Sequence, residues 1–202
     1  MRRALNFIMG LTVFLVMLSA AAFATGDAAS PLAARKARWQ SSLEKSEFQF
    51  SEGEANLPYR LSQFQGDCQI EMIYDPAKWL GLTFKLLRGG KEIATIEGTM
   101  DTALCGTKGA IYFAQPSLGG CGCHVTAFDS VTGNKIWEHE LEAVGLVPHS
   151  VYSNRVIMRQ LVDTKEGNSL CIIGRESFGD YEEVLDEASG MQLAHKIYRQ
   201  GF

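Results

Sequence analysis

The sequence lacks the short motifs that mark most catalytic and metal sites. Its four histidines do not fall in an HExxH arrangement or any other paired spacing. Ser177 lies in a loop with glycines nearby, but it does not stand in a Gly-x-Ser-x-Gly elbow. An excess of positive charge is also missing, because 19 Lys and Arg against 23 Asp and Glu give a net charge of −4. The missing motifs favour a non-catalytic protein over an enzyme without excluding an enzyme, and the charge argues against a nucleic-acid-binding protein.

The N-terminal apolar run is too short to anchor the chain comfortably in a membrane. It extends from Phe7 to Leu18, whereas a membrane-spanning helix needs ~20 residues. Arg2 and Arg3 precede the run, and the small-residue sequence Ala22-Phe23-Ala24 follows it. This pattern predicts a signal peptide over residues 1–24, and no cysteine follows the run to indicate a lipoprotein. We expect an exported protein, periplasmic or extracellular, without a membrane anchor after cleavage.

The remaining length suits one domain with a single core. Residues 25–46 are predicted to form a leader and a short helix, because Ala33 to Glu47 carries a weak helical pattern. From residue 47 to residue 202, alternating polar and apolar positions and many β-branched and aromatic residues predict a single, mainly β domain.

One hairpin pattern recurs along this β region. Asp129, Thr132 and Gly133 are predicted to form a turn between two strands, because Asp and Thr oxygens accept backbone N–H bonds and glycine tolerates a positive φ. A second copy contains Asp186, Ser189 and Gly190, and a fainter third copy extends from Arg88 to Ile96. Recurrence of one hairpin predicts four-stranded antiparallel blades.

The predicted strands group into units of this kind. They are Phe48–Ser51, Tyr59–Gln63, Gln69–Tyr74, Leu82–Leu87, Glu92–Glu97, Thr102–Cys105, Ala110–Gln115, Cys123–Asp129, Lys135–Leu141, Arg155–Val162, Ser169–Gly174, Glu182–Asp186 and Gln192–Tyr198. The matching glycines Gly133 and Gly190 are 57 residues apart, more than the ~40–45 of a common propeller repeat. We attribute the excess to longer loops in the last unit.

The segment Phe128-Asp-Ser-Val-Thr-Gly-Asn-Lys-Ile-Trp137 resembles the repeat of quinoprotein-like (PQQ-like) β-propellers. The resemblance implies that Trp137 fills the space between neighbouring sheets. In the second copy Ala194-His195 replaces the aromatic residue, and the N-terminal unit barely matches. The fold class predicted is therefore a small or incomplete β-propeller with a short N-terminal helix. The alternative is a β-sandwich that contains an ordinary Thr-Gly hairpin.

The enzymes that this repeat resembles use about eight blades around a cofactor and a calcium ion. Here three or at most four blades fit, and the sequence has no Asp-x-Asp-x-Asp-Gly calcium loop. No cofactor is therefore predicted. An open arc of blades could be closed by a sheet from Phe48–Gln63 or completed by a second copy of the chain in a homo-oligomer.

The segment Gly119-Gly-Cys-Gly-Cys-His124 is the one local cluster with reactive side chains. Its residues Cys121, Cys123 and His124 could hold Zn or Cu, although strand alternation places His124 on the opposite face from the two cysteines. A covalent haem site requires two residues between the cysteines, and here there is one. The third interpretation is a disulfide from Cys105 to Cys121 or Cys123, with Cys68 and Cys171 as further candidates.

These patterns predict a secreted, non-catalytic β-repeat module that binds a protein or a glycan. The alternative is a small exported metal-binding or thiol-redox protein centred on Cys121 and Cys123. A hydrolase whose site is assembled only in space is a third hypothesis. The sequence names no ligand.

Overall fold

The computed structural model describes residues 30–47, 68–74, 81–99, 102–116, 122–145, 155–162, 165–176 and 179–198. The predicted signal peptide and the predicted strands Phe48–Ser51 and Tyr59–Gln63 lie outside these ranges. The chain divides into two compact units, residues 1–34 and 35–202. No helix found in the described ranges has the length and apolar character needed to cross a membrane.

Helix α2 (Pro31–Lys45) is the predicted N-terminal helix. It begins at a serine cap, because Ser30 Oγ accepts a hydrogen bond from the Ala33 N–H at 3.2 Å and proline occupies the first helical position. At its other end, Ser46 donates from both its N–H and its hydroxyl to the Leu43 carbonyl.

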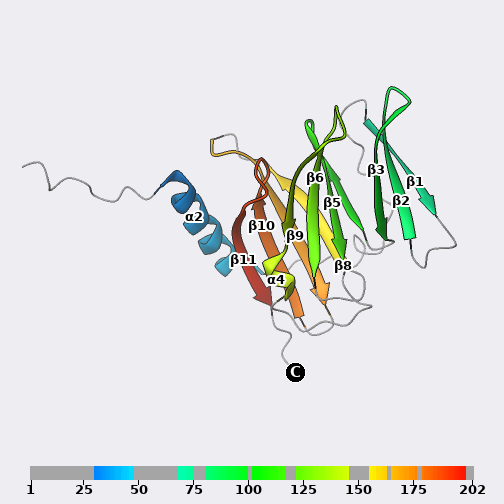
Figure 1. Cartoon of the computed structure of the whole chain (residues 1–202). Helices are drawn as coiled ribbons and strands as arrows, with labels where there is room; N and C mark the ends of the chain where they lie inside the picture. Colours follow the sequence, from blue (N-terminus) through cyan, green and yellow to red (C-terminus); the bar gives the residue numbers. More distant parts are fainter. Residues whose placement is uncertain are drawn as a thin grey trace, which may run out of the picture. The chain divides into compact units, whose positions relative to one another are not determined.

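The rest of the described chain is mainly β, as predicted, and forms three antiparallel sheets (Figure 1). The first sheet has the order β1 (Cys68–Tyr74), β2 (Gly81–Arg88), β3 (Lys91–Thr99). The second has the order β4 (Ala103–Gly106), β5 (Ala110–Pro116), β6 (Cys123–Asp129), β7 (Lys135–Glu140). The third has the order β11 (Gln192–Tyr198), β10 (Gly179–Asp186), β9 (Ser169–Glu176), β8 (Arg155–Leu161). These eleven strands lie within a few residues of their predicted positions.

Each sheet contains one hairpin with a β-bulge at the same place. The pairing register shifts at Leu86/Leu87 in the first sheet, at Ala127/Phe128 in the second and at Val184/Leu185 in the third. The bulge residues left out of the pairing are Ile93, Ile136 and Leu193. The three hairpins β2–β3, β6–β7 and β10–β11 are therefore equivalent, including the first, whose sequence match was faint.

Two apolar clusters join consecutive sheets. Strand β5 contributes to both, because alternate side chains point to opposite faces. Ile111 and Phe113 pack with Phe84 of the first sheet. Tyr112 and Ala114 belong instead to the cluster shared with the third sheet, which contains Val125, Leu170, Ile172 and Tyr181. A strand buried on both faces needs apolar residues at every position, which explains the run Ala110-Ile-Tyr-Phe-Ala114.

The long spacing between Gly133 and Gly190 has a different main cause from the one predicted. Strand β3 is joined to β4 by residues 100–102, whereas β7 is joined to β8 by residues 141–154. The longer connection begins with the short helix α4 (Glu142–Gly145), which the sequence analysis did not predict. Loop growth within the last unit, at residues 162–168, accounts for only a small part of the excess.

Candidate functional site

The predicted turn at Asp129 is held by its own side chains. Asp129 Oδ1 accepts hydrogen bonds from the Val131 N–H at 2.9 Å, from the Thr132 N–H at 2.7 Å and from the Thr132 hydroxyl at 2.9 Å. Gly133, at φ 75°, donates its N–H to the Asp129 carbonyl. The hydrogen bonds from Thr132, followed by that from Val131, hold the pKa of Asp129 below its ordinary value.

The turn at Asp186 repeats this arrangement. Asp186 Oδ1 accepts from the Ser189 N–H at 2.8 Å and from the Ser189 hydroxyl at 2.7 Å, and Gly190 at φ 71° donates to the Asp186 carbonyl. The first hairpin instead turns through Gly89 and Gly90, both at positive φ, and has no aspartate. A two-residue turn of this kind matches the twist of its strands without side-chain bonds.

Each aspartate turn rests on the sheet before it. A Cβ placed on Gly133 would lie 2.3 Å from the Ile93 carbonyl oxygen of β3. A Cβ on Gly190 would lie 2.5 Å from the ring of Trp137 on β7. Trp137 also donates from Nε1 to the Glu187 carbonyl at 3.0 Å. Glycine is thus required at both positions by φ and by the close approach of the neighbouring sheet.

Helix α2 takes the corresponding place on the third sheet. Its side chains Trp39 and Leu43 pack on Val184, Leu193 and Ala194. The cross-strand pair Val184 and Ala194 matches the pairs Leu86–Ala94 and Ala127–Trp137 of the other sheets, because all three lie directly before the bulge. Those two pairs belong to the clusters that join a sheet to the next sheet. The helix therefore occupies a position that a sheet occupies at the two earlier interfaces.

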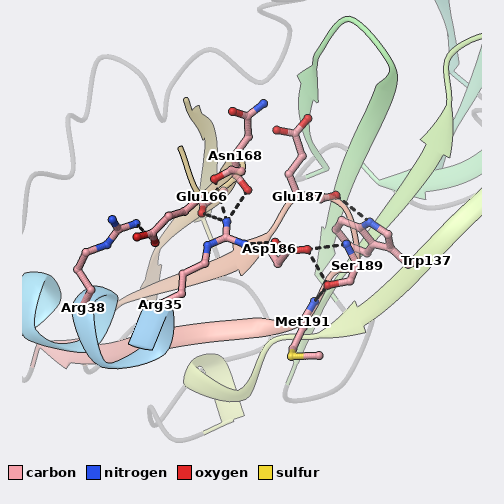
Figure 2. Close-up of polar contacts among 11 residues, drawn as sticks. Arg35, Arg38, Trp137, Glu166, Asn168, Asp186, Glu187, Ser189 and Met191 are labelled. Atoms are coloured by element: carbon pink, nitrogen blue, oxygen red, sulfur yellow. Dashed lines mark hydrogen bonds and ion pairs between the residues drawn. The ribbon is translucent and has the colours of Figure 1, made fainter. Parts of the chain in front are cut away.

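Arg35 connects helix α2 to the Asp186 turn (Figure 2). Its guanidinium pairs with Asp186 Oδ2 and donates to the Gly167 carbonyl at 3.0 Å, the Asn168 carbonyl at 2.8 Å and Ser169 Oγ at 2.9 Å. Burial acts to raise the pKa of Asp186, but the hydrogen bonds from Ser189 and Arg35 outweigh it and the pKa is lowered. One carboxylate oxygen of Asp186 thus accepts the hydrogen bonds of its own turn, and the other pairs with Arg35 of the helix.

A carboxylate is fully buried between the second and third sheets. Glu183 of β10 has no exposed surface. It accepts hydrogen bonds from the Ala143 N–H of α4 at 2.8 Å and from Gln192 Nε2 of β11 at 3.2 Å. His139 Nε2 of β7 lies 3.0 Å from Glu183 Oε1. Because these three partners come from three elements and fill both carboxylate oxygens, Glu183 fixes the sheets and the β7–β8 connection rather than facing a substrate.

A second polar cluster joins the same two sheets. Glu187 accepts hydrogen bonds from the Tyr112 hydroxyl at 3.0 Å and from Gln160 Nε2 at 2.7 Å. Burial, and then the nearby Glu187 charge, raise the pKa of Tyr112 well above its ordinary value. The phenol is therefore neutral and acts as a hydrogen-bond donor.

The cysteine cluster is only partly described. Cys123 is buried on β6, whereas His124 is about one-third exposed and its Nε2 lies 2.9 Å from Gln115 Oε1. The alternation that separates these two residues follows the prediction. Cys121 lies outside the described residues. Nowhere in the described ranges do three or more His, Cys, Asp or Glu side chains gather closely enough to hold a metal ion. The Zn or Cu site stays a prediction.

The described thiols are shielded from reaction. The cysteines in the described ranges are Cys68, Cys105, Cys123 and Cys171, and no disulfide joins any two of them. Cys121 lies outside these ranges, and the predicted disulfide stays a prediction. Burial raises the pKa of Cys105 to about 11. Burial also raises the pKa of Cys171, whose thiol donates to Glu182 Oε1 at 3.2 Å. Because the thiolate is the nucleophile, Cys105 and Cys171 are unreactive at neutral pH.

Sequence reasoning missed Arg35 and the Glu183 cluster. For Glu183 a signal existed, since alternation in Tyr181-Glu-Glu-Val-Leu185 places Glu183 on the same face as Tyr181 and Leu185. His139, one of the four histidines without a paired spacing, contacts this buried carboxylate. For Arg35 no local signal distinguishes it from the other basic residues of the helix.

Comparisons with known proteins add little. No family model matches the chain, and no curated protein sequence matches it. Among solved structures, the Bacillus megaterium YpeB C-terminal domain aligns with 76% of this chain and all of its own length, at 10% identity and a TM-score of 0.20. A similarity of this size carries no argument about fold or function.

Proposed function

We propose that the chain is an exported, non-catalytic module of three blade-like sheets in an open arc, and that it binds a protein partner. The equivalent hairpins support the blade interpretation, because each aspartate turn rests on the sheet before it. In a small propeller, successive blades stack face to face in the same order as the chain. The export prediction, which rests on residues 1–24, belongs to the same proposal.

The chemistry of the described side chains supports a binding role over catalysis. Glu183 is fully buried and Glu187 is partly buried, and both carboxylates accept hydrogen bonds from other elements of the fold. The Cys105 and Cys171 thiols have raised pKa values and are buried. Polar groups that are already satisfied hold a fold together, whereas a catalytic group needs access to a substrate.

The observation that carries the proposal is the edge of strand β1. When the three sheets are aligned by their bulges, β1 takes the position of β5 and β9. Strand β5 also pairs with β4, and β9 also pairs with β8. Within the described ranges β1 pairs only with β2. Near its end, Ile73 is 39% exposed and Tyr74 is 58% exposed. Among the described residues this edge of β1 is unpaired, and an unpaired strand edge beside an exposed aromatic side chain suits the addition of a partner's strand.

A photo-crosslinking amino acid tests this proposal. A benzoylphenylalanine at Tyr74, in cells that export the chain, is expected to give an adduct with one protein, and the same probe at exposed Val162 is not. The Ile73→Asp substitution should abolish the adduct, and Ile136→Asp, which alters an exposed apolar residue of β7, should leave it. Equal adducts at Tyr74 and Val162, or none at either, would count against a protein partner. A stoichiometric Zn or Cu ion in the purified protein would favour the metal-binding alternative.

A further inference from the structure

The surface beneath helix α2 resembles one on which a turn of this chain already rests. Gly133 rests on Ile93 and Ala94, the bulge residue of β3 and the residue after it. The third sheet has Leu193 and Ala194 at the same two positions. At β3 the glycine meets the main-chain carbonyl of the first residue and the Cβ of the alanine, and the third sheet has the same two groups at these positions.

Helix α2 is held to the third sheet by the polar contacts of Arg35, but it covers this second site with limited apolar contact. In the described ranges its one fully buried side chain is Leu43, while Trp39 is partly exposed. The same ranges contain two buried side-chain donors without a hydrogen-bond partner, Arg35 Nε and Trp39 Nε1, and both belong to this helix. A buried donor left unpaired destabilises the bound position of the helix, which lowers the cost of releasing it.

Release of the helix would leave the third hairpin intact. Asp186 Oδ1 holds its turn, whereas only Oδ2 pairs with Arg35. The equivalent Asp129 turn forms the same hydrogen bonds and rests against β3 rather than a helix. The face of Val184, Leu193 and Ala194 can thus be uncovered without unfolding the sheet beneath it.

We propose that helix α2 is a displaceable cap, and that the face beneath it binds a β-sheet of another protein that carries an Asp-x-x-Thr-Gly or Asp-x-x-Ser-Gly hairpin. The two interfaces between consecutive sheets identify this occupant. At each of them, a sheet with such a turn takes the place that helix α2 takes on the third sheet. This inference goes beyond the proposed function, because it concerns the third sheet and not the β1 edge.

The first part of the test measures release of the helix. Arg35→Glu places a negative charge beside Asp186 and three oxygen acceptors, whereas Lys36→Glu makes the same charge change at the exposed neighbouring residue. In the full chain, Arg35→Glu should raise hydrogen exchange of residues 37–45 at least tenfold and leave exchange in β10 unchanged. Lys36→Glu should change neither. If Arg35→Glu also exposes β10, Trp39→Ala provides the same comparison without a buried charge.

The second part measures occupation of the face. The probe is a backbone-cyclised peptide with the sequence of residues 127–137, and its control carries Gly133→Val. The probe should bind the Arg35→Glu chain at least tenfold more tightly than the wild type or Lys36→Glu, and the control peptide should not bind. Equal affinity for all chains, equal affinity of both peptides, or no binding to the released chain would overturn the inference. The Tyr74 crosslink reports on the first sheet, whereas this test reports on the third sheet. A negative result in one experiment therefore does not refute the proposal that the other one tests.

Discussion

Alanine substitutions at Gly133 and at Gly90 distinguish two reasons why a turn requires glycine, namely its positive φ and the close approach of a neighbouring sheet. The two residues have φ values of 75° and 76°. An alanine at such a φ costs about 1–2 kcal/mol at either position. At Gly90 the new Cβ meets no atom of the described residues within 4 Å, whereas at Gly133 it lies 2.3 Å from the Ile93 carbonyl oxygen and 2.7 Å from the carbonyl carbon. Forcing this backbone contact apart adds about 1–3 kcal/mol at Gly133 only.

A urea titration of the two variants measures the difference. With a slope of about 2 kcal/mol per molar urea, a difference of about 2 kcal/mol moves the midpoint by about 1 M. The Gly133→Ala midpoint should therefore lie well below that of Gly90→Ala, with similar slopes. Equal midpoints would refute the claim that the second sheet's turn rests on β3, since φ alone would then explain both costs.

Two further predictions concern the buried polar groups. Glu183→Gln should lower the free energy of unfolding by about 1–3 kcal/mol, because one amide oxygen cannot accept from all the donors around that carboxylate. Glu138→Gln, at an exposed ion pair, should change it by less than about 0.5 kcal/mol in the same urea assay. The raised pKa of Cys105 predicts full stability below pH 9 and a loss between pH 9 and about pH 11, because the unfolded thiol, at 9.0, loses its proton first. This loss approaches about 2.7 kcal/mol above pH 11 and is about half of that at pH 10, and Cys105→Ala should remove the loss present at pH 10 from the difference between midpoints at pH 8 and pH 10.

The hairpins could be predicted from sequence because their chemistry is local. Asp129, Thr132 and Gly133 lie within five residues and satisfy one another, so the pattern is visible without knowledge of the rest of the fold. The first hairpin was faint because Gly89 and Gly90 replace the aspartate turn. Its equivalence is visible only in the bulge at Leu86/Leu87, which is a feature of strand register.

The contacts that join the elements could not be predicted in the same way. Arg35 and Asp186 are 151 residues apart, and a basic residue on a thinly apolar helix is usually solvated. The side chain of Glu183 is buried because His139, Gln192 and the Ala143 N–H converge on it, and such convergence depends on how the sheets pack. Local patterns therefore identified strands and turns, whereas the functions of individual side chains followed from tertiary structure.

The central claim is that each aspartate turn connects one sheet to the sheet before it, and a double-mutant cycle between Gly190 and Trp137 tests it most directly. In the wild-type background, Gly190→Ala should cost the φ penalty plus the overlap with the Trp137 ring, about 2–5 kcal/mol in all. In a Trp137→Ala background the ring is gone, so the same substitution should cost only about 1–2 kcal/mol. An unchanged cost of Gly190→Ala in the two backgrounds, measured by circular dichroism in urea, would contradict the account.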